Sequence, residues 1–153
     1  MRALLILIVI SFASITGSSQ MILSGVATGS CDCYELTDFT NQSGSIWSPG
    51  TIDLTNTFDM SFEVNLGADD VWGADGMIFA LRQTGTSPGG IGNGMGYSGI
   101  ANSIGVEIDT WNSSPAVPTD IPEDHVGMSS NGTVNHNLVA PITIANIEDG
   151  LYH

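Results

Sequence analysis

Short runs in which apolar and polar residues alternate are the feature that most limits what this chain can fold into. The clearest run covers residues 52–64, where Phe58, Met60, Phe62 and Val64 share one face and polar side chains occupy the other. Because successive side chains of a strand point to opposite faces, this period predicts a half-buried antiparallel strand. No amphipathic helical run of useful length is present, so the pattern predicts an all-β fold, an antiparallel β-sandwich or jelly roll. Further strands are expected over residues 76–83, 104–111, 125–129 and 138–147.

Composition excludes one large class of partners. The chain of 153 residues is long enough for one domain with its own core. Lys+Arg number 2 against 16 Asp+Glu, which gives a net charge of −14. Nucleic acid is therefore excluded as a partner, because phosphates require a positive surface. The 19 glycines and the charged fraction of 12% favour a turn-rich β protein.

The N-terminal segment predicts a secretory signal peptide over residues 1–19. Arg2 supplies a short basic region, residues 3–13 are apolar, and small residues follow at 17–19. The apolar run is too short to cross a bilayer as an anchor. We therefore expect a secreted or cell-surface protein, a domain over residues 20–153, and no membrane span in the mature chain.

The two cysteines favour free thiols over a structural bridge. Cys31 and Cys33 flank a single residue, and a disulfide at that spacing is strained in an extended chain. No further cysteine is present to complete a zinc site of the thiolate kind. We expect two unpaired residues near the start of a strand.

Residue types that bind cations gather in one short window. In the strand expected over 104–111, Glu107 and Asp109 point to the same face, where two carboxylates repel each other unless a cation lies between them. Asp120 and His125 follow after a loop. Carboxylates and carbonyls suit calcium or magnesium, and an imidazole suits manganese or zinc. From these residues alone, a metal site and a solvated acidic loop remain alternatives.

A second group of residues suits a ligand that carries hydroxyl groups. Asp75 comes just before the strand expected at 76–83, where its carboxylate meets either a ligand hydroxyl or its own backbone in a turn. The loop 89–99 is rich in glycine, so it is either an irregular connection or a place where bare backbone N–H groups approach a ligand. No helix follows to hold a phosphate, which argues against a nucleotide. Aromatic rings that either stack on a sugar or belong to the core are Trp72, Tyr97 and Trp111.

Taken in order, these motifs resemble the L-type (legume-type) lectin domain, particularly its forms in secreted bacterial surface proteins. The likeness is carried by residues 74–81, by the glycine loop 89–99 and by residues 106–127, and residues 33–47 are similar to the first strands of the bacterial members. The resemblance implies a concanavalin-like jelly roll that binds carbohydrate and has no catalytic activity. Domains of this family are longer, so the fold is expected to be incomplete at its C-terminus.

The resemblance also implies a site with calcium (Ca²⁺) beside a transition metal, often manganese (Mn²⁺). By motif position, the transition metal would be held by Glu107, Asp109, Asp120 and His125. Calcium would be held by Asp109, Asp120 and the backbone carbonyl of Trp111. Ser113 stands where the family has its calcium-binding asparagine, which is a departure from the pattern.

The implied sugar site surrounds the same metals. Asp75 would accept hydrogen bonds from sugar hydroxyls, and the family pattern implies a cis peptide bond between Ala74 and Asp75. A backbone N–H near Gly94 would donate a hydrogen bond to the sugar, and Trp111 and Ser113 would border it.

Two other functions remain open on sequence. One is an adhesive or structural module of a larger secreted protein without a working sugar site. The other is a glycoside hydrolase of the laminarinase-like type, whose catalytic strand resembles Glu107-Ile108-Asp109. Retaining hydrolysis needs a second carboxyl about 5 Å from the first. The next positions on that face are Trp111 and Ser113, neither of which is an acid, so the chain is predicted not to be an enzyme.

Overall fold

The computed structural model describes residues 7–10, 20–30 and 33–153, and the described chain is all-β. Its strands pair antiparallel throughout, which confirms the predicted fold class. In chain order the elements are β1 (Leu7–Ile10), β2 (Ile22–Gly25), β3 (Thr28–Ser30), β4 (Cys33–Glu35), β5 (Gly44–Trp47), β6 (Phe62–Asn65), β7 (Gly76–Arg82), the 3-10 helix η1 (Gly92–Gly94), β8 (Ser103–Asp109), β9 (His125–Ser130) and β10 (Val139–Thr143).

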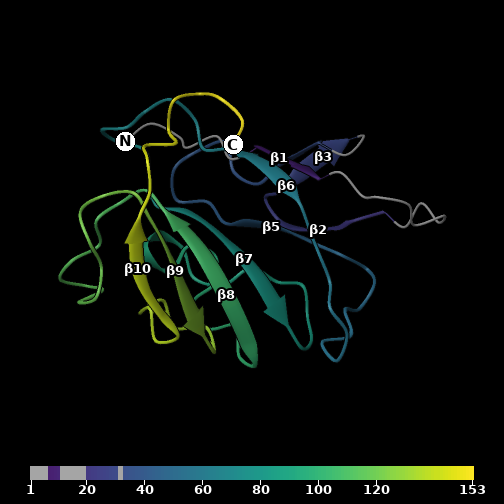
Figure 1. Ribbon diagram of the computed structural model, residues 1–153. Coiled ribbons are helices and arrows are strands. Elements are labelled where there is room, and N and C mark those ends of the chain that lie inside the picture. Colours follow the sequence, from purple (N-terminus) through teal and green to yellow (C-terminus); the bar gives the residue numbers. More distant parts are fainter. Residues whose placement is uncertain (1–6, 11–19, 31–32) are drawn as a thin grey trace.

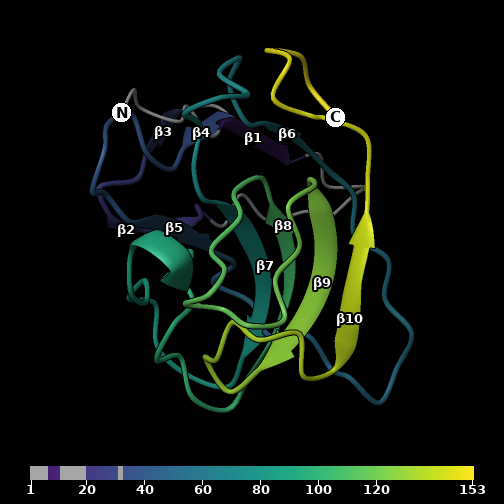
Figure 2. The ribbon, with the colours of Figure 1, turned by 90° about the vertical axis from the view of Figure 1, so that its left-hand side faces the viewer.

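The strands form layers of a sandwich (Figures 1 and 2). One sheet has the order β10-β9-β8-β7, a second has the order β3-β4-β1-β6, and β2 pairs with β5 alone. In both views the sheet of β7 to β10 lies below the sheet that contains β1, β3 and β6, and Figure 2 shows β2 and β5 to the left of β7. Each sheet keeps open edges in the described part of the chain, so the sandwich is not closed into a barrel.

The apolar core lies between these layers. It contains the buried side chains of Leu36, Val64, Leu66 and Met77. The rings of Phe62 from β6 and Phe79 from β7 stack with centroids 5.5 Å apart and so join the two layers. Further apolar side chains that pack against this core are Ala27, Ile46, Phe62, Ile108 and Ile147.

The strand expected over residues 52–64 is wrong for most of its length. β6 begins only at Phe62, and Phe58 and Met60 are exposed by 48% and 36%. Among the described residues, the pairing with β1 covers only Phe62–Asn65, so the preceding segment has no described strand partner. The strand expected over 138–147 is also shorter and covers Val139–Thr143. The other three predicted strands are confirmed as β7, β8 and β9.

Residues 1–6 and 11–19 of the predicted signal peptide lie outside the described residues, and β1 lies between them. The signal peptide stays a prediction. Cys33 has a free thiol, while Cys31 also lies outside the described residues. In the part of the chain that the structure describes, no helix has the length and apolar character that a membrane crossing needs. At the other end, His153 exchanges two backbone hydrogen bonds of 2.9 Å with Val64, which extends the β6 sheet by a further pairing.

Candidate functional site

The register of two strands, β8 and β9, brings the predicted cation ligands together. Asp109 at the end of β8 lies opposite His125 at the start of β9, and Glu107 lies opposite Gly127. Directly opposed residues of antiparallel strands share a face, so all of these positions point to the same side of the sheet. That side is the one away from the sandwich core, and the loops around it bury it.

The loop after β8 returns Asp120 to this face. The Nε2 atom of His125 lies 3.3 Å from Oδ1 of Asp120 and 3.9 Å from Oδ2 of Asp109. The loop is held by the acids themselves, because the N–H of Trp111 donates to Oδ1 of Asp109 at 2.9 Å and the N–H of Ser113 donates to Oδ2 of Asp120. Ligand atoms of Asp109, Asp120 and His125 all lie within 4.8 Å of one another.

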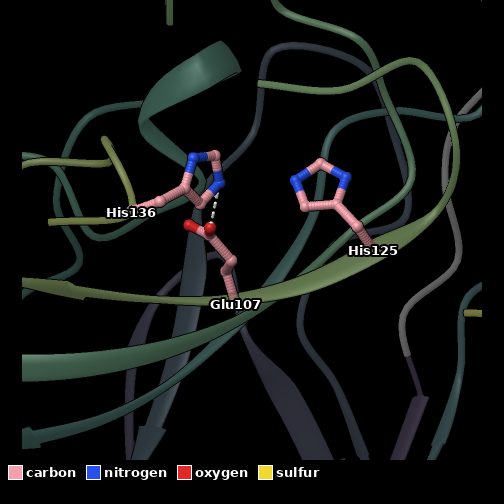
Figure 3. A group of neighbouring side chains, drawn as sticks. All are labelled: Glu107, His125 and His136. Carbon is pink, nitrogen blue, oxygen red and sulfur yellow. Dashed lines mark ion pairs between the residues drawn. The ribbon is translucent and has the colours of Figure 1, made fainter. Parts of the chain in front are cut away.

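A second histidine, His136, joins the cluster and was not predicted from the sequence. Figure 3 shows the carboxylate of Glu107 and the rings of His125 and His136 gathered on one side of the strands. Nε2 of His136 lies in contact with Oε1 of Glu107, and the centroids of the two imidazole rings lie 5.3 Å apart. Glu107, His125 and His136 also offer ligand atoms within 4.8 Å of one another. Their side chains are almost completely buried.

The electrostatics of the cluster favour a bound cation. Burial, and then the charge of Asp120, raises the pKa of Glu107 to about 7. Burial raises the pKa of Asp109 to about 8, where the hydrogen bond from Trp111 opposes the shift and the charges of neighbouring carboxylates add to it. Groups of this kind hold protons at neutral pH unless a cation replaces them.

No basic side chain supplies that cation within the described residues. Arg82 is the only lysine or arginine among them. It lies at the far end of β7, where it donates to the carbonyls of Thr84 and Ser87 and covers the ring of Trp47 at 5.0 Å. Buried carboxylates without a counter-ion are costly, so the residues present fit a metal ion.

The proton positions on His125 support the same conclusion. Nδ1 of His125 lies 2.9 Å from the carbonyl oxygen of Glu123. A carbonyl can only accept a hydrogen bond, so Nδ1 carries a proton, and in the neutral ring the lone pair of Nε2 faces the carboxylates. A lone pair that faces carboxylate oxygens needs a cation between them. The tautomer is the one that metal-binding histidines commonly use.

Asp75 lies beside the metal cluster. The peptide bond between Ala74 and Asp75 is cis, as the resemblance implies. The carbonyl of Asp75 accepts a hydrogen bond of 3.1 Å from the N–H of Thr110, directly after Asp109. Burial raises the pKa of the Asp75 carboxyl. The sequence therefore identified a carboxylate that the fold holds next to β8.

Asp75 lines a cleft of about 870 Å³ on this part of the molecule. Trp72 and Trp111 line the same cleft and are exposed by 58% and 38%, which leaves their rings free to meet a ligand. Tyr97 also borders this cleft, but it is a core residue, since it is buried and its hydroxyl accepts a hydrogen bond of 2.9 Å from Ser103.

The glycine loop lies partly at the cleft, at the 3-10 helix η1. Gly94 is buried, and its N–H already donates to the carbonyl of Ile91 at 3.2 Å. Neither Gly94 nor Ser113 lines the cleft, whereas Gly92 does. A side-chain carbon built on Gly92 would meet nothing within 4 Å, so its backbone is open to a ligand. The exposed end of η1 at Gly92 is therefore a further candidate for the backbone donor, and the donor near Gly94 stays a prediction.

A comparison with known families agrees with this geometry. The model of the legume lectin beta-barrel domain matches residues 12–151. The chain belongs to this family, which is a family of carbohydrate-binding, lectin-type modules and is in general non-catalytic. Legume lectins typically bind metal ions, and the cluster on β8 and β9 supplies possible ligands for one.

Proposed function

We propose that this chain is a secreted lectin domain that binds sugar hydroxyls at Asp75, beside a calcium ion and a transition-metal ion. The observation that carries the proposal is the common location of three features. The buried acids at Asp109 and Asp120 lie next to Asp75, and the cleft at Asp75 has two exposed tryptophans. Charged acceptors and flat aromatic rings are what sugar hydroxyls and sugar faces require.

The proposed metals have a structural role. Glu107, Asp109, Asp120 and His125 would hold the transition metal, and Asp109, Asp120 and the carbonyl of Trp111 would hold calcium. Each metal neutralises acids that otherwise hold protons, and so fixes the loop 110–124 next to Asp75. Asp75 accepts hydrogen bonds from the sugar, and the exposed backbone near Gly92 donates one. Trp72 and Trp111 exclude water from the apolar face of the sugar ring.

The affinity for one sugar unit is expected to be low. A single carboxylate and a few backbone groups make few contacts in an open cleft, so the dissociation constant should fall between about 1 mM and tens of micromolar, or roughly −4 to −6 kcal/mol. Secretion is a separate part of the proposal and rests on the composition of residues 1–19.

Binding to a panel of immobilised glycans, with calcium and manganese supplied, tests the proposal. Asp75→Asn keeps the shape of the side chain and removes its charge, and it should abolish binding while the melting temperature stays within a few degrees. Asp59→Asn is the matched control, because Asp59 is exposed and does not line the cleft. Unchanged glycan binding in Asp75→Asn would show that Asp75 does not belong to the sugar site. Metal binding without any glycan binding would instead favour an adhesive or structural module.

A further inference from the structure

We infer that His136 is a direct ligand of the transition metal, so that the site holds the metal with two imidazoles and prefers zinc-like ions to manganese. The inference rests on the proposed function, because it concerns the same metal. The family pattern implies a set of four metal ligands. His136 lies outside that motif and would be an additional ligand.

The hydrogen bonds of His136 fix which ring nitrogen faces the site. The hydroxyl of Thr119 donates its single proton to the carbonyl of Asn135 at 3.0 Å. The same oxygen lies 2.9 Å from Nδ1 of His136, so it accepts from that nitrogen. The proton of the ring is therefore on Nδ1, and Nε2 presents a lone pair. This is the arrangement by which a second residue orients a metal-binding histidine.

The lone pair of His136 points at the cluster and has no hydrogen bond there. Nε2 of His125, Nε2 of His136 and both carboxylate oxygens of Glu107 are buried without a hydrogen-bond partner among the described residues. The side chain of His136 is exposed by only 1%, and its Nε2 contacts Oε1 of Glu107. Two nitrogen lone pairs and a carboxylate that converge in a buried space are the pattern of a cation site, since nothing else present neutralises them.

The two groups of ligands share one residue, so they hold a single transition-metal ion between them, apart from the proposed calcium. His125 belongs both to the group with Asp109 and Asp120 and to the group with Glu107 and His136. Its Nδ1 is bonded to the carbonyl of Glu123, so it offers a single lone pair to both groups. The two groups therefore describe one ion with ligands on both sides of it.

The strands leave room for the second imidazole. Gly127 lies opposite Glu107, and a side-chain carbon built there would come 2.5 Å from Oε1 of Glu107 and 2.5 Å from Cδ2 of His136. The backbone N–H of His136 donates to Oγ of Ser129, two residues further along β9, at 3.0 Å. Gly127 has no side chain to block the way, and the hydrogen bond to Ser129 fixes the backbone of His136. The imidazole of His136 can therefore reach the cluster over β9.

The number of imidazoles decides which metals are favoured. Carboxylate and water ligands suit manganese, whereas imidazole suits zinc, nickel and copper. A site with two imidazoles should therefore discriminate more strongly for zinc over manganese than a site with one. His136 would therefore control the difference between the affinities of the site for zinc and for manganese.

The test uses protein stripped by a chelator and reloaded with zinc or manganese. Zinc-edge X-ray absorption should count two imidazoles in the unaltered protein. In His136→Asn it should count one, with zinc affinity reduced by about 10- to 100-fold and manganese affinity reduced by less than about threefold. Asparagine suits the backbone of His136, whose φ is 53°, and its amide can keep the hydrogen bond to Thr119. His153→Asn, an exchange outside the cluster, should change neither count nor affinity.

The outcomes separate this inference from the proposed function. One imidazole in the unaltered protein, or an equal loss of zinc and manganese affinity in His136→Asn, would overturn the role of His136 and leave the metal site standing. Failure of the unaltered protein to bind either metal would overturn both. The absorption spectrum of the unaltered protein decides the ligand count even if the variant does not fold.

Discussion

Replacing Glu148 with glutamine should stabilise the fold, and the gain should grow as the pH rises. Glu148 is exposed by only 3%, and no hydrogen bond of ordinary geometry reaches its carboxylate oxygens among the described residues, although the hydroxyl of Thr110 lies close enough to lower the pKa of Glu148. The group lies against Gly73, where a side-chain carbon would meet its Oε1 atom. Burial, and then the charge of Asp124, raises its pKa from 4.5 to about 7. Glutamine has the same shape and no charge to bury.

The size of the effect follows from that shift. A carboxyl whose pKa is higher in the folded state destabilises the fold only above its unfolded pKa, and the full cost is reached once the pH exceeds the folded pKa. One pKa unit corresponds to about 1.4 kcal/mol. The cost of Glu148 is therefore about 1 kcal/mol at pH 5 and about 3 kcal/mol at pH 8. Glu148→Gln should recover these amounts.

Urea unfolding at pH 5 and pH 8, both with a chelator present, measures the difference in free energy. The neighbouring Asp149→Asn is a matched control of opposite sign. Asp149 is exposed, and hydrogen bonds from the side chain of His153 and from the N–H of Leu151 lower its pKa, so its loss should cost a little stability. An equal gain for Glu148→Gln at both pH values, or a less stable variant at pH 8, would refute the reasoning.

Two further predictions concern the metals. Removing them with a chelator should lower the melting temperature by about 5–10 °C at pH 8. The loss in melting temperature should be smaller at pH 5, because protons then neutralise Glu107 and Asp109, whose pKa values are about 7 and 8. Scanning calorimetry measures both losses, and an equal loss at the two pH values would contradict this prediction. Ser113→Asn should strengthen calcium binding by about tenfold through one added carbonyl ligand, and calorimetric titration that shows no change would mean that Ser113 does not occupy the position of the family's asparagine.

Much of the site could be predicted because it follows from local periodicity. The alternation along residues 104–111 puts Glu107 and Asp109 on one face, and an antiparallel partner must then put His125 on the same face. The loop between them needs only to return Asp120, and the register of β8 with β9 does bring these side chains together.

The parts that could not be predicted depend on contacts between distant segments. His136 lies in a turn after β9 and reaches the cluster only because Gly127 leaves space above the strand. No local period marks such a residue, although the turn at Asn131-Gly132 indicates that the chain folds back over β9. The failure over residues 52–61 also concerns a distant contact, because an alternating segment forms a strand only where another strand offers it hydrogen bonds, and no such strand pairs with it in the described part of the chain.

The fold and the site are coupled through a single strand. On one face of β8, Ile108 packs against the core between the sheets, and on the other Glu107 and Asp109 enter the metal cluster. A slip of one residue would send the acids into the core and the apolar side chains toward the metals, so both faces specify the same register. Because the ligands sit within strands and not only in a loop, cations that bind the cluster stabilise the pairing of β8 with β9 itself. The proposed metals would therefore contribute to the stability of the sheet as well as to sugar binding in the cleft beside it.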